Sequence, residues 1–422
     1  MMCKTRNASP RRHREFHGTY RTYSRADHAR SVFDTVNRSG GKVGLVRNFS
    51  CGILMYYMGF FSSSKGKLGI DIGTASIKVV ELAKESNRFQ LSNYGIYELE
   101  PGDEAIMAGS AGRSKITQLS NADIIAGIKT ILKSTGMKSR DVVASIPSYP
   151  TFSTTITMPY LSEDEIAKAI PFEARKYIPV PLSEVQLDWA IVNVRKGQLK
   201  TATLTAQDTA GQPTVEVFLV AVPKVDVKRY QDIAKGADLN LKALELENFA
   251  LIRSIIGNDL SPVCVMNVGG RSTSILIVEN GFQHASHDYE IGGYEITNTI
   301  ARSLGVSLKR SEEMKRSLGM KKIPENIIRD AIVSLLDSMA FEVNKTIHNY
   351  EDIKKVKIEK IVLVGGLANM PDITPYFSEK LGREVALGNP LARVVLPSGL
   401  EVLRQELNST FAVSLGLAMR YI

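Results

Sequence analysis

The residues best able to hold a phosphate lie in two short turns rich in glycine and small or hydroxyl-bearing side chains. The first turn consists of Gly73, Thr74, Ala75 and Ser76. The second consists of Gly269, Gly270, Arg271 and Ser272. Backbone N–H groups in such turns form a concave donor surface that phosphate oxygens can approach closely. Two facing turns would grip a polyphosphate from opposite sides, although either turn alone could be an ordinary hairpin.

Two charged side chains accompany the first turn. Asp71 stands at the end of the strand that leads into it, where a carboxylate can hold a metal-bound water. Lys78 lies on the following strand and could face negative charge. The alternative for Lys78 is a solvated lysine on an edge strand.

A third turn joins a buried strand to a helix. The strand is predicted from Lys360 to Val364, and the helix is expected to begin near Pro371. Between them, the candidate binding residues are Gly365, Gly366, Leu367 and Met370. Paired glycines at such a corner permit a flat ring and its sugar to lie against bare backbone.

Two similar sets of strands must position the phosphate turns. The first set is predicted at residues 68–73, 77–82 and 89–97. The second set is predicted at residues 263–268, 274–278 and 282–289. A helix capped by Asn121 and a strand over 142–146 are expected between them. Two copies of one supersecondary unit indicate a duplicated α/β core.

The order of these three turns resembles that of the actin, Hsp70 and sugar-kinase superfamily, over residues 67–422. The resemblance implies an α/β fold of the actin-like, ribonuclease-H-like duplicated type: a two-domain ATPase fold, here with a small inserted α+β subdomain. It implies ATP and Mg2+ as cofactors, with Asp71 and Asn267 reaching the metal through water. Glu312 and Lys315 match the superfamily's Ala-Glu-x-x-Lys helix and would contact the ribose and base. Without that context they form an i,i+3 surface salt bridge.

Two positions bear on whether the chain is an enzyme, a question that the sequence leaves open. Asn267 replaces the superfamily's usual aspartate; it keeps an acceptor oxygen but loses the charge facing a divalent cation. Glu247 stands where related bacterial actins keep a glutamate that orients the attacking water, but Asn248 replaces the usual following proline. We therefore expect tight nucleotide binding with weak or absent ATPase activity, the nucleotide acting as a structural ligand or switch.

An insert within the first domain distinguishes branches of the superfamily. Ser162 is placed to cap a helix, and the continuation from Pro171 to Glu184 is similar to the signature of the PilM family of type IV pilus assembly proteins. Strands at 185–194 and 215–222 complete the insert. The division protein FtsA also carries an insert here, but FtsA-like chains normally continue into an amphipathic membrane helix. This sequence stops at residue 422, inside a predicted closing helix, which favours PilM.

The resemblance also implies a division of the chain into domains. They are expected to be a basic leader at 1–57, the first part of domain 1A at 66–148, the inserted subdomain 1C at 149–223, the second part of 1A at 224–260, domain 2 at 261–404 with a small helical 2B at about 307–356, and a closing helix at 405–422 that returns to domain 1A.

The PilM resemblance implies a cytoplasmic scaffold of the pilus inner-membrane complex, recruited to the inner face of the cytoplasmic membrane by its partners. The partners would be the N-terminal peptide of a PilN-like bitopic membrane protein and other inner-membrane components. The peptide would dock as an extended segment, with Phe172, Tyr177 and Ile178 as candidate groove residues. Those three could instead merely seal the helix to its own sheet. The competing interpretations are an FtsA-like division or filament-forming ATPase and a metabolite kinase of the same superfamily. The sequence does not decide whether the chain forms a homo-oligomer.

Charge and composition argue against nucleic-acid binding, zinc binding and a membrane span. The net charge of +9 could indicate nucleic-acid binding, but residues 1–57 hold eleven Lys and Arg against three Asp and Glu, and the rest is almost neutral. We expect this leader to be disordered or spurious, with folding beginning near Met58, and no nucleic-acid partner; a basic arm or a targeting segment is the alternative. The three cysteines are too widely spaced for a zinc site. The longest apolar stretch, residues 51–61, is too short to cross a bilayer.

Overall fold

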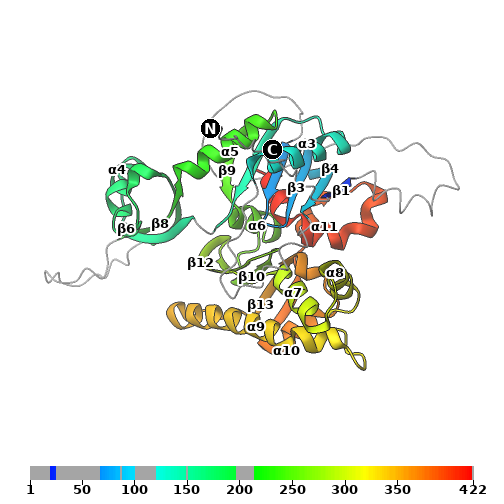
Figure 1. The fold of residues 1–422 in the computed structure, drawn as a ribbon. Helices are drawn as coiled ribbons and strands as arrows, with labels where there is room; N and C mark the ends of the chain where they lie inside the picture. The colour runs from blue at the N-terminus through cyan, green and yellow to red at the C-terminus, as the bar shows by residue number, and fades with distance from the viewer. Residues whose placement is uncertain are drawn as a thin grey trace, which may run out of the picture.

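The computed structural model describes residues 20–24, 67–85, 88–99, 120–148, 151–195 and 213–420, which form three β-sheets with helices between and around them (Figure 1). Among these residues, no helix is both long enough and apolar enough to cross a bilayer. Met58 and the apolar stretch at 51–61 lie outside the described residues.

The first sheet has the strand order β1-β4-β3-β2-β5-β9, with β15 paired to β4. Its strands are β1 (Tyr20–Ser24), β2 (Lys67–Ile72), β3 (Ser76–Glu85), β4 (Arg88–Leu99), β5 (Asp141–Ile146), β9 (Asn240–Leu246) and β15 (Val394–Val395). Strands β2, β3 and β4 form the predicted antiparallel meander, and β2, β5 and β9 run parallel. The carboxyl ends of those parallel strands therefore share one edge of the sheet, where ligands bind in open α/β folds.

Strand β1 belongs to the basic leader, in which the sequence pattern predicted no strand. It pairs antiparallel with β4 and so extends that edge of the sheet. The other residues of the leader lie outside the described residues.

The second sheet has the order β12-β11-β10-β13-β14. Its strands are β10 (Val263–Val268), β11 (Thr273–Glu279), β12 (Phe282–Tyr289), β13 (Lys360–Gly365) and β14 (Glu384–Leu387). Strands β10 to β12 repeat the antiparallel meander of the first sheet, while β10, β13 and β14 run parallel. The duplication predicted from the sequence is thus confirmed at the level of strand pairing.

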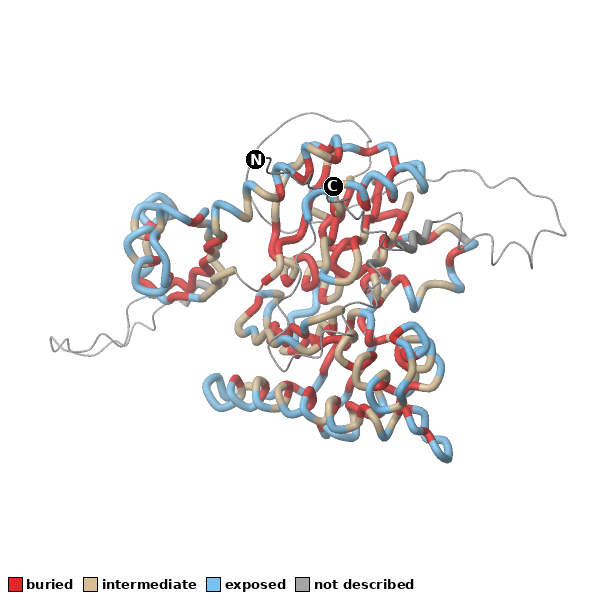
Figure 2. Tube along the Cα trace, in the orientation of Figure 1, coloured by how far each residue is buried: buried red, intermediate tan, exposed pale blue. Residues whose placement is uncertain are grey.

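Helices α6 (Glu247–Ile255) and α12 (Ala412–Ala418) lie between the two sheets, where their apolar side chains share one core with both (Figure 2). The two helices cross so closely that a methyl group on Gly416 would lie 1.8 Å from the carbonyl oxygen of Ala250. A single closing helix was predicted over 405–422. The observed chain instead forms α11 (Arg404–Thr410) and α12, separated at Phe411, whose ring is buried in the core that α11 and α12 share with the first sheet.

The outer faces of both sheets are covered by helices. On the first sheet these are α3 (Asn121–Thr135) and α5 (Lys224–Gly236). On the second they are α7 (Gly293–Leu304), α8 (Leu308–Ser317), α9 (Ile327–Lys354) and α10 (Ile373–Leu381). Short 3-10 turns are η1 (Leu182–Glu184), η2 (Gly366–Asn369), η3 (Pro390–Arg393) and η4 (Ser398–Leu403). The predicted cap of α3 is wrong by one residue, because Ser120 accepts the Asp123 amide and Asn121 is the first helical residue.

The third sheet stands apart from the other two and has its own apolar core (Figures 1 and 2). It consists of β6 (Phe152–Pro159), β8 (Thr214–Pro223) and β7 (Val185–Arg195), in that order, with helix α4 (Glu163–Ala174) packed on it. The predicted cap of α4 is confirmed: Ser162 and Glu165 form a capping box.

Candidate functional site

The two phosphate turns, which belong to different sheets, lie against each other. In each turn the amide of the first glycine donates to the carbonyl three residues on: Gly73 to Ser76 at 3.0 Å and Gly269 to Ser272 at 2.9 Å. A methyl group placed on Gly270 would lie 2.6 Å from Cβ of Ala75. The two candidate turns therefore face one another with little space between their tips.

Asp71 and Lys78 form an ion pair beside the first turn. The Lys78 ammonium donates to Asp71 Oδ2 at 3.2 Å, and Ser145 Oγ donates to Asp71 Oδ1 at 3.0 Å. Strand β3 lies inside the sheet and the Lys78 side chain is only 19% exposed, so the alternative of a solvated edge-strand lysine is wrong.

Glu247 is the first residue of α6, directly after β9, and its carboxylate is buried in the same region. The Ser148 amide donates to its Oε1 at 3.3 Å. Burial, together with the negative charges of Asp71 and Asp288, raises the pKa of Glu247 to about 7, although Ser148 and Lys78 oppose the rise. A carboxyl group at such a pKa is only partly ionised at neutral pH.

Three buried oxygen atoms near Glu247 have no hydrogen-bond partner within the described part of the chain. They are Ser148 Oγ, Asn248 Oδ1 and Asp288 Oδ1. Buried polar groups normally find partners, so unpaired ones clustered in one place indicate room for water or a polar ligand. These acceptor oxygens therefore fit a hydrated cation, and the backbone amides of the two turns fit a phosphate.

The third turn packs against the second. Gly365 lies opposite Val268 on the neighbouring parallel strand, with a φ of 87°, and a methyl group there would lie 2.2 Å from the Val268 oxygen. Only glycine fits both this backbone conformation and this approach. Gly366 is exposed, and no atom lies within 4 Å of where its Cβ would be. The backbone of Gly366 is therefore open to a ligand.

One prediction about this turn becomes more specific, and another needs correction. The side chains of Leu367 and Met370 are 2% and 5% exposed and belong to the core of the second sheet, so only their backbone atoms can face a ligand. The helix begins at Ile373, two residues later than predicted, because the chain first makes the 3-10 turn η2.

Glu312 and Lys315 form a salt bridge on α8 at 2.6 Å. Lys315 is buried and Glu312 is half-buried, and Lys315 also donates to the carbonyl of Gly293 at 3.1 Å and to Thr297 Oγ1 at 2.8 Å. Burial alone would raise the pKa of Glu312, but the Lys315 charge and hydrogen bonds from Lys315, Thr297 and Arg316 lower it to about 2. The salt-bridge interpretation thus holds, in a buried setting next to the second turn.

The start of α7 supports the second turn, a contact that no sequence motif predicted. The Gly293 amide donates to the Gly269 carbonyl at 2.9 Å, and the Tyr294 amide donates to the Gly270 carbonyl at 2.7 Å. The Arg271 guanidinium lies 4.9 Å from the centre of the Tyr294 ring. The glycine pair at Gly292 and Gly293, directly after a predicted strand, was the signal that could have revealed this contact.

The three groove candidates in the insert divide into two kinds. Phe172 and Tyr177 are 66% and 45% exposed, whereas Ile178 is 6% exposed and packs inside the insert's own core. Ile178 packs between the helix and the sheet of the insert, so its side chain does not line an exposed groove.

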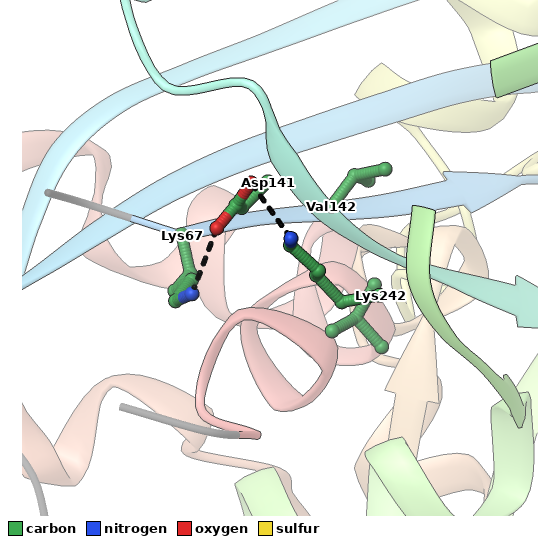
Figure 3. Close-up of a pocket in the computed structure, with 5 residues that line it drawn as sticks. Lys67, Asp141, Val142 and Lys242 are labelled. Carbon is green, nitrogen blue, oxygen red and sulfur yellow. Dashed lines mark hydrogen bonds and ion pairs between the residues drawn. The ribbon is translucent and has the colours of Figure 1, made fainter. Parts of the chain in front are cut away.

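A separate pocket lies at the opposite end of the first sheet (Figure 3). It is lined by Lys67 and Asp141, which begin β2 and β5, together with Lys242, Val142 and Val143. Asp141 pairs with Lys67 at 3.2 Å and with Lys242 at 3.4 Å. Because the phosphate turn follows the other end of β2, this pocket is distinct from the candidate site.

The two duplicated sheets, the facing turns and the inserted third sheet define an actin-like fold. The family described as type IV pilus assembly protein PilM matches residues 69–422, and the chain belongs to that family. Its predicted resemblance to PilM and its predicted fold class are thereby confirmed, and membership gives the chain a role in type IV pilus assembly.

Three solved structures illustrate what this chain is similar to. A structure described as the PilM-PilN type IV pilus biogenesis complex is 25% identical in sequence, with a TM-score of 0.67, covering 84% of this chain and 98% of that chain. The ethanolamine utilization protein EutJ from Carboxydothermus hydrogenoformans is 16% identical, with a TM-score of 0.48, covering 85% and 90%. MreB 5 of Spiroplasma citri, bound to AMPPNP, is 12% identical, with a TM-score of 0.47, covering 84% and 95%.

Proposed function

We propose that this chain binds ATP with Mg2+ between its two phosphate turns and serves as a cytoplasmic scaffold of the type IV pilus inner-membrane complex. The observation that carries the nucleotide part is the contact between the turns at Gly270 and Ala75, supported by the matching hydrogen bonds of Gly73 and Gly269. Two equivalent donor surfaces that face each other suit a chain of phosphates better than any single anion.

Each part of the nucleotide has candidate partners. The backbone of residues 73–76 and 269–272 would hold the phosphates, and the backbone at Gly365 and Gly366 would receive the adenosine. Asp71 and Asn267 would reach the magnesium through water, and the Glu312–Lys315 pair borders the same space through Gly293. Magnesium neutralises phosphate charge when bound.

Hydrolysis is expected to be slow in this arrangement. Asn267 brings no charge to the cation, so it holds the cation's water shell less strongly than the superfamily's usual aspartate would. The nucleotide would then act by holding the two halves of the molecule together.

The partner is proposed to be the N-terminal peptide of a PilN-like membrane protein, which would recruit the chain to the inner face of the membrane. Support comes from the similarity to a PilM-PilN complex. On this chain, Phe172 and Tyr177 are exposed aromatic side chains five residues apart, and the Arg175 guanidinium lies 5.6 Å from the Phe172 ring. Exposed aromatic residues flanked by arginine are typical anchors for a peptide.

Nucleotide binding is tested by unfolding the protein with and without ATP, ADP and GTP, each with and without Mg2+. A ligand present at one hundred times its Kd should raise the free energy of unfolding by about 2.7 kcal/mol. We expect stabilisation by adenine nucleotides; no stabilisation by any of them at millimolar concentration contradicts the proposal.

The partner is tested by the affinity for a synthetic PilN N-terminal peptide. Phe172→Ala and Tyr177→Ala should weaken binding, whereas Tyr160→Ala, which removes another exposed aromatic of the insert, should not. A chain that ignores this peptide but pellets as a polymer with ATP would support the filament-forming alternative instead.

A further inference from the structure

The second half of the molecule carries a carboxylate that its sequence pattern does not reveal. We propose that Asp288, two strands away from Asn267, is the acidic group by which the second sheet holds the cation through its water shell. This inference rests on the proposed function, because it names a further residue of the same nucleotide site.

The strand register places Asp288 in line with Asn267. Asn267 on β10 lies directly opposite Ser274 on β11, and Ser274 lies directly opposite Asp288 on β12. Residues directly opposite each other on antiparallel strands project from the same face of a sheet. The three polar side chains therefore form one row across the second sheet, which we call the Asp288 row.

The corresponding row on the first sheet has a different distribution of charge. There Asp71 lies opposite Lys78, which lies opposite Ile96. The carboxylate stands on the central strand and is neutralised by the adjacent lysine at 3.2 Å. In the Asp288 row, the central strand carries the neutral amide of Asn267. The carboxylate lies two strands further out, next to a serine instead of a lysine.

The Asp288 row faces the first half of the molecule. Val265 and Leu276, which lie two positions from Asn267 and Ser274 on the same strands, pack in the core shared with α6. Because side chains alternate along a strand, Asn267, Ser274 and Asp288 project toward the same side. Asp288 is close enough to Glu247 for its charge to raise the pKa of that carboxyl group.

Burial of an Asp288 oxygen without a partner costs folding free energy unless a ligand binds to it. Asp288 hydrogen-bonds Ser274, but its Oδ1 is buried without a partner, and no lysine or arginine forms an ion pair with it within the described ranges. Ser148 Oγ, which is also buried and unpaired, belongs to the residue whose amide holds Glu247. One unpaired buried oxygen from each half, Ser148 Oγ and Asp288 Oδ1, indicates a hydrated site between the two halves.

A carboxylate that acts through water need not contact the metal. Magnesium keeps several waters at about 2.1 Å, and a hydrogen bond from such a water adds about 2.7 Å. A carboxylate oxygen that acts through water therefore lies about 5 Å from the cation. Adjacent strands are about 4.8 Å apart. Asp288 and Asn267, on either side of Ser274, can therefore serve one hydrated cation together.

The test is the affinity for ATP, measured by calorimetry on the full chain with Mg2+ and again with EDTA. Asp288→Asn should weaken magnesium–ATP binding about tenfold, because a charge-assisted hydrogen bond becomes a neutral one. It should strengthen ATP binding in EDTA, because a negative charge facing the phosphates is removed. Glu290→Gln, which removes an exposed negative charge two residues away, should change neither affinity.

A second variant separates this role from a structural one. Asn267→Asp combined with Asp288→Asn returns the carboxylate to the central strand and should restore the magnesium dependence. Asp288→Asn should also unfold at or above the wild-type temperature, since it removes an unpaired charge. An unchanged ratio of the two affinities in Asp288→Asn, or no recovery in the double variant, overturns the inference. Absence of ATP binding by the wild type, with or without Mg2+, would instead overturn the proposed function.

Discussion

The substitution Gly270→Ala tests whether the two phosphate turns form one site. The added methyl carbon would lie 2.6 Å from Cβ of Ala75 and 3.6 Å from Thr74 Oγ1. Carbon atoms do not approach to 2.6 Å without bonding, so the turns must separate. Gly270 does not have a positive φ, so the substitution adds this clash without backbone strain.

The size of the effect follows from the cost of overpacking. An extra methyl group at a closed contact costs about 1–3 kcal/mol. If nucleotide binding requires the turns to close, this cost falls on the bound state and weakens ATP binding by about 5- to 150-fold. The free protein can relieve the clash by opening, so its free energy of unfolding should change little.

The assay is calorimetric titration with magnesium–ATP, with urea unfolding of the free protein as a check on folding. Gly399→Ala is the matched control, because Gly399 lies in η4, outside both turns, and no atom lies within 4 Å of its added methyl group. Ala75→Gly in the Gly270→Ala background removes the opposing methyl group and should restore affinity. Wild-type affinity in Gly270→Ala, or no rescue by Ala75→Gly, would refute the reasoning.

Four further substitutions probe the rest of the structure. Glu247 has a pKa of about 7 in the folded state, against an ordinary 4.5, so the folded state binds its proton more tightly. The free energy of unfolding therefore falls as the pH rises from 4.5 through 7. Glu247→Gln should therefore raise the free energy of unfolding by up to about 3 kcal/mol at pH 8 and by little near pH 4.5, in urea titrations at each pH; a gain independent of pH would contradict this. Ile178→Ala should lower the free energy of unfolding by about 2–4 kcal/mol, whereas Phe172→Ala, at an exposed position, should change it by less than about 1 kcal/mol, both measured by urea unfolding; equal losses would show that Ile178 is not a core residue. Gly416→Ala should destabilise the chain more than Ile178→Ala or Phe172→Ala, because its methyl group would lie 1.8 Å from the Ala250 oxygen. Unfolding near the wild-type temperature in calorimetry would contradict this and would show that α6 and α12 can move apart.

Local sequence patterns were sufficient to predict most strands and the duplication. Apolar segments within residues 68–97 and 263–289 indicated both meanders, and Ser162 indicated the start of α4. Such features depend on residues close together in the chain, and so do the glycine-rich turns.

Features that depend on long-range packing could not be predicted. Asp288 became a candidate only when the register across β10, β11 and β12 was known, because nothing near it in the sequence resembles a metal site. The burial of Ile178, Leu367 and Met370 depends on how a turn directs its side chains, which hydrophobicity alone does not specify. The break at Phe411 arises where the chain enters the space between the sheets.

The central claim is that one nucleotide lies between the two phosphate turns. A crystal structure of the chain with magnesium and a non-hydrolysable ATP analogue tests it most directly. We expect the phosphates between residues 73–76 and 269–272, with the adenosine at Gly366. Phosphates bound instead by Lys67 and Lys242, at the opposite end of the first sheet, would contradict it.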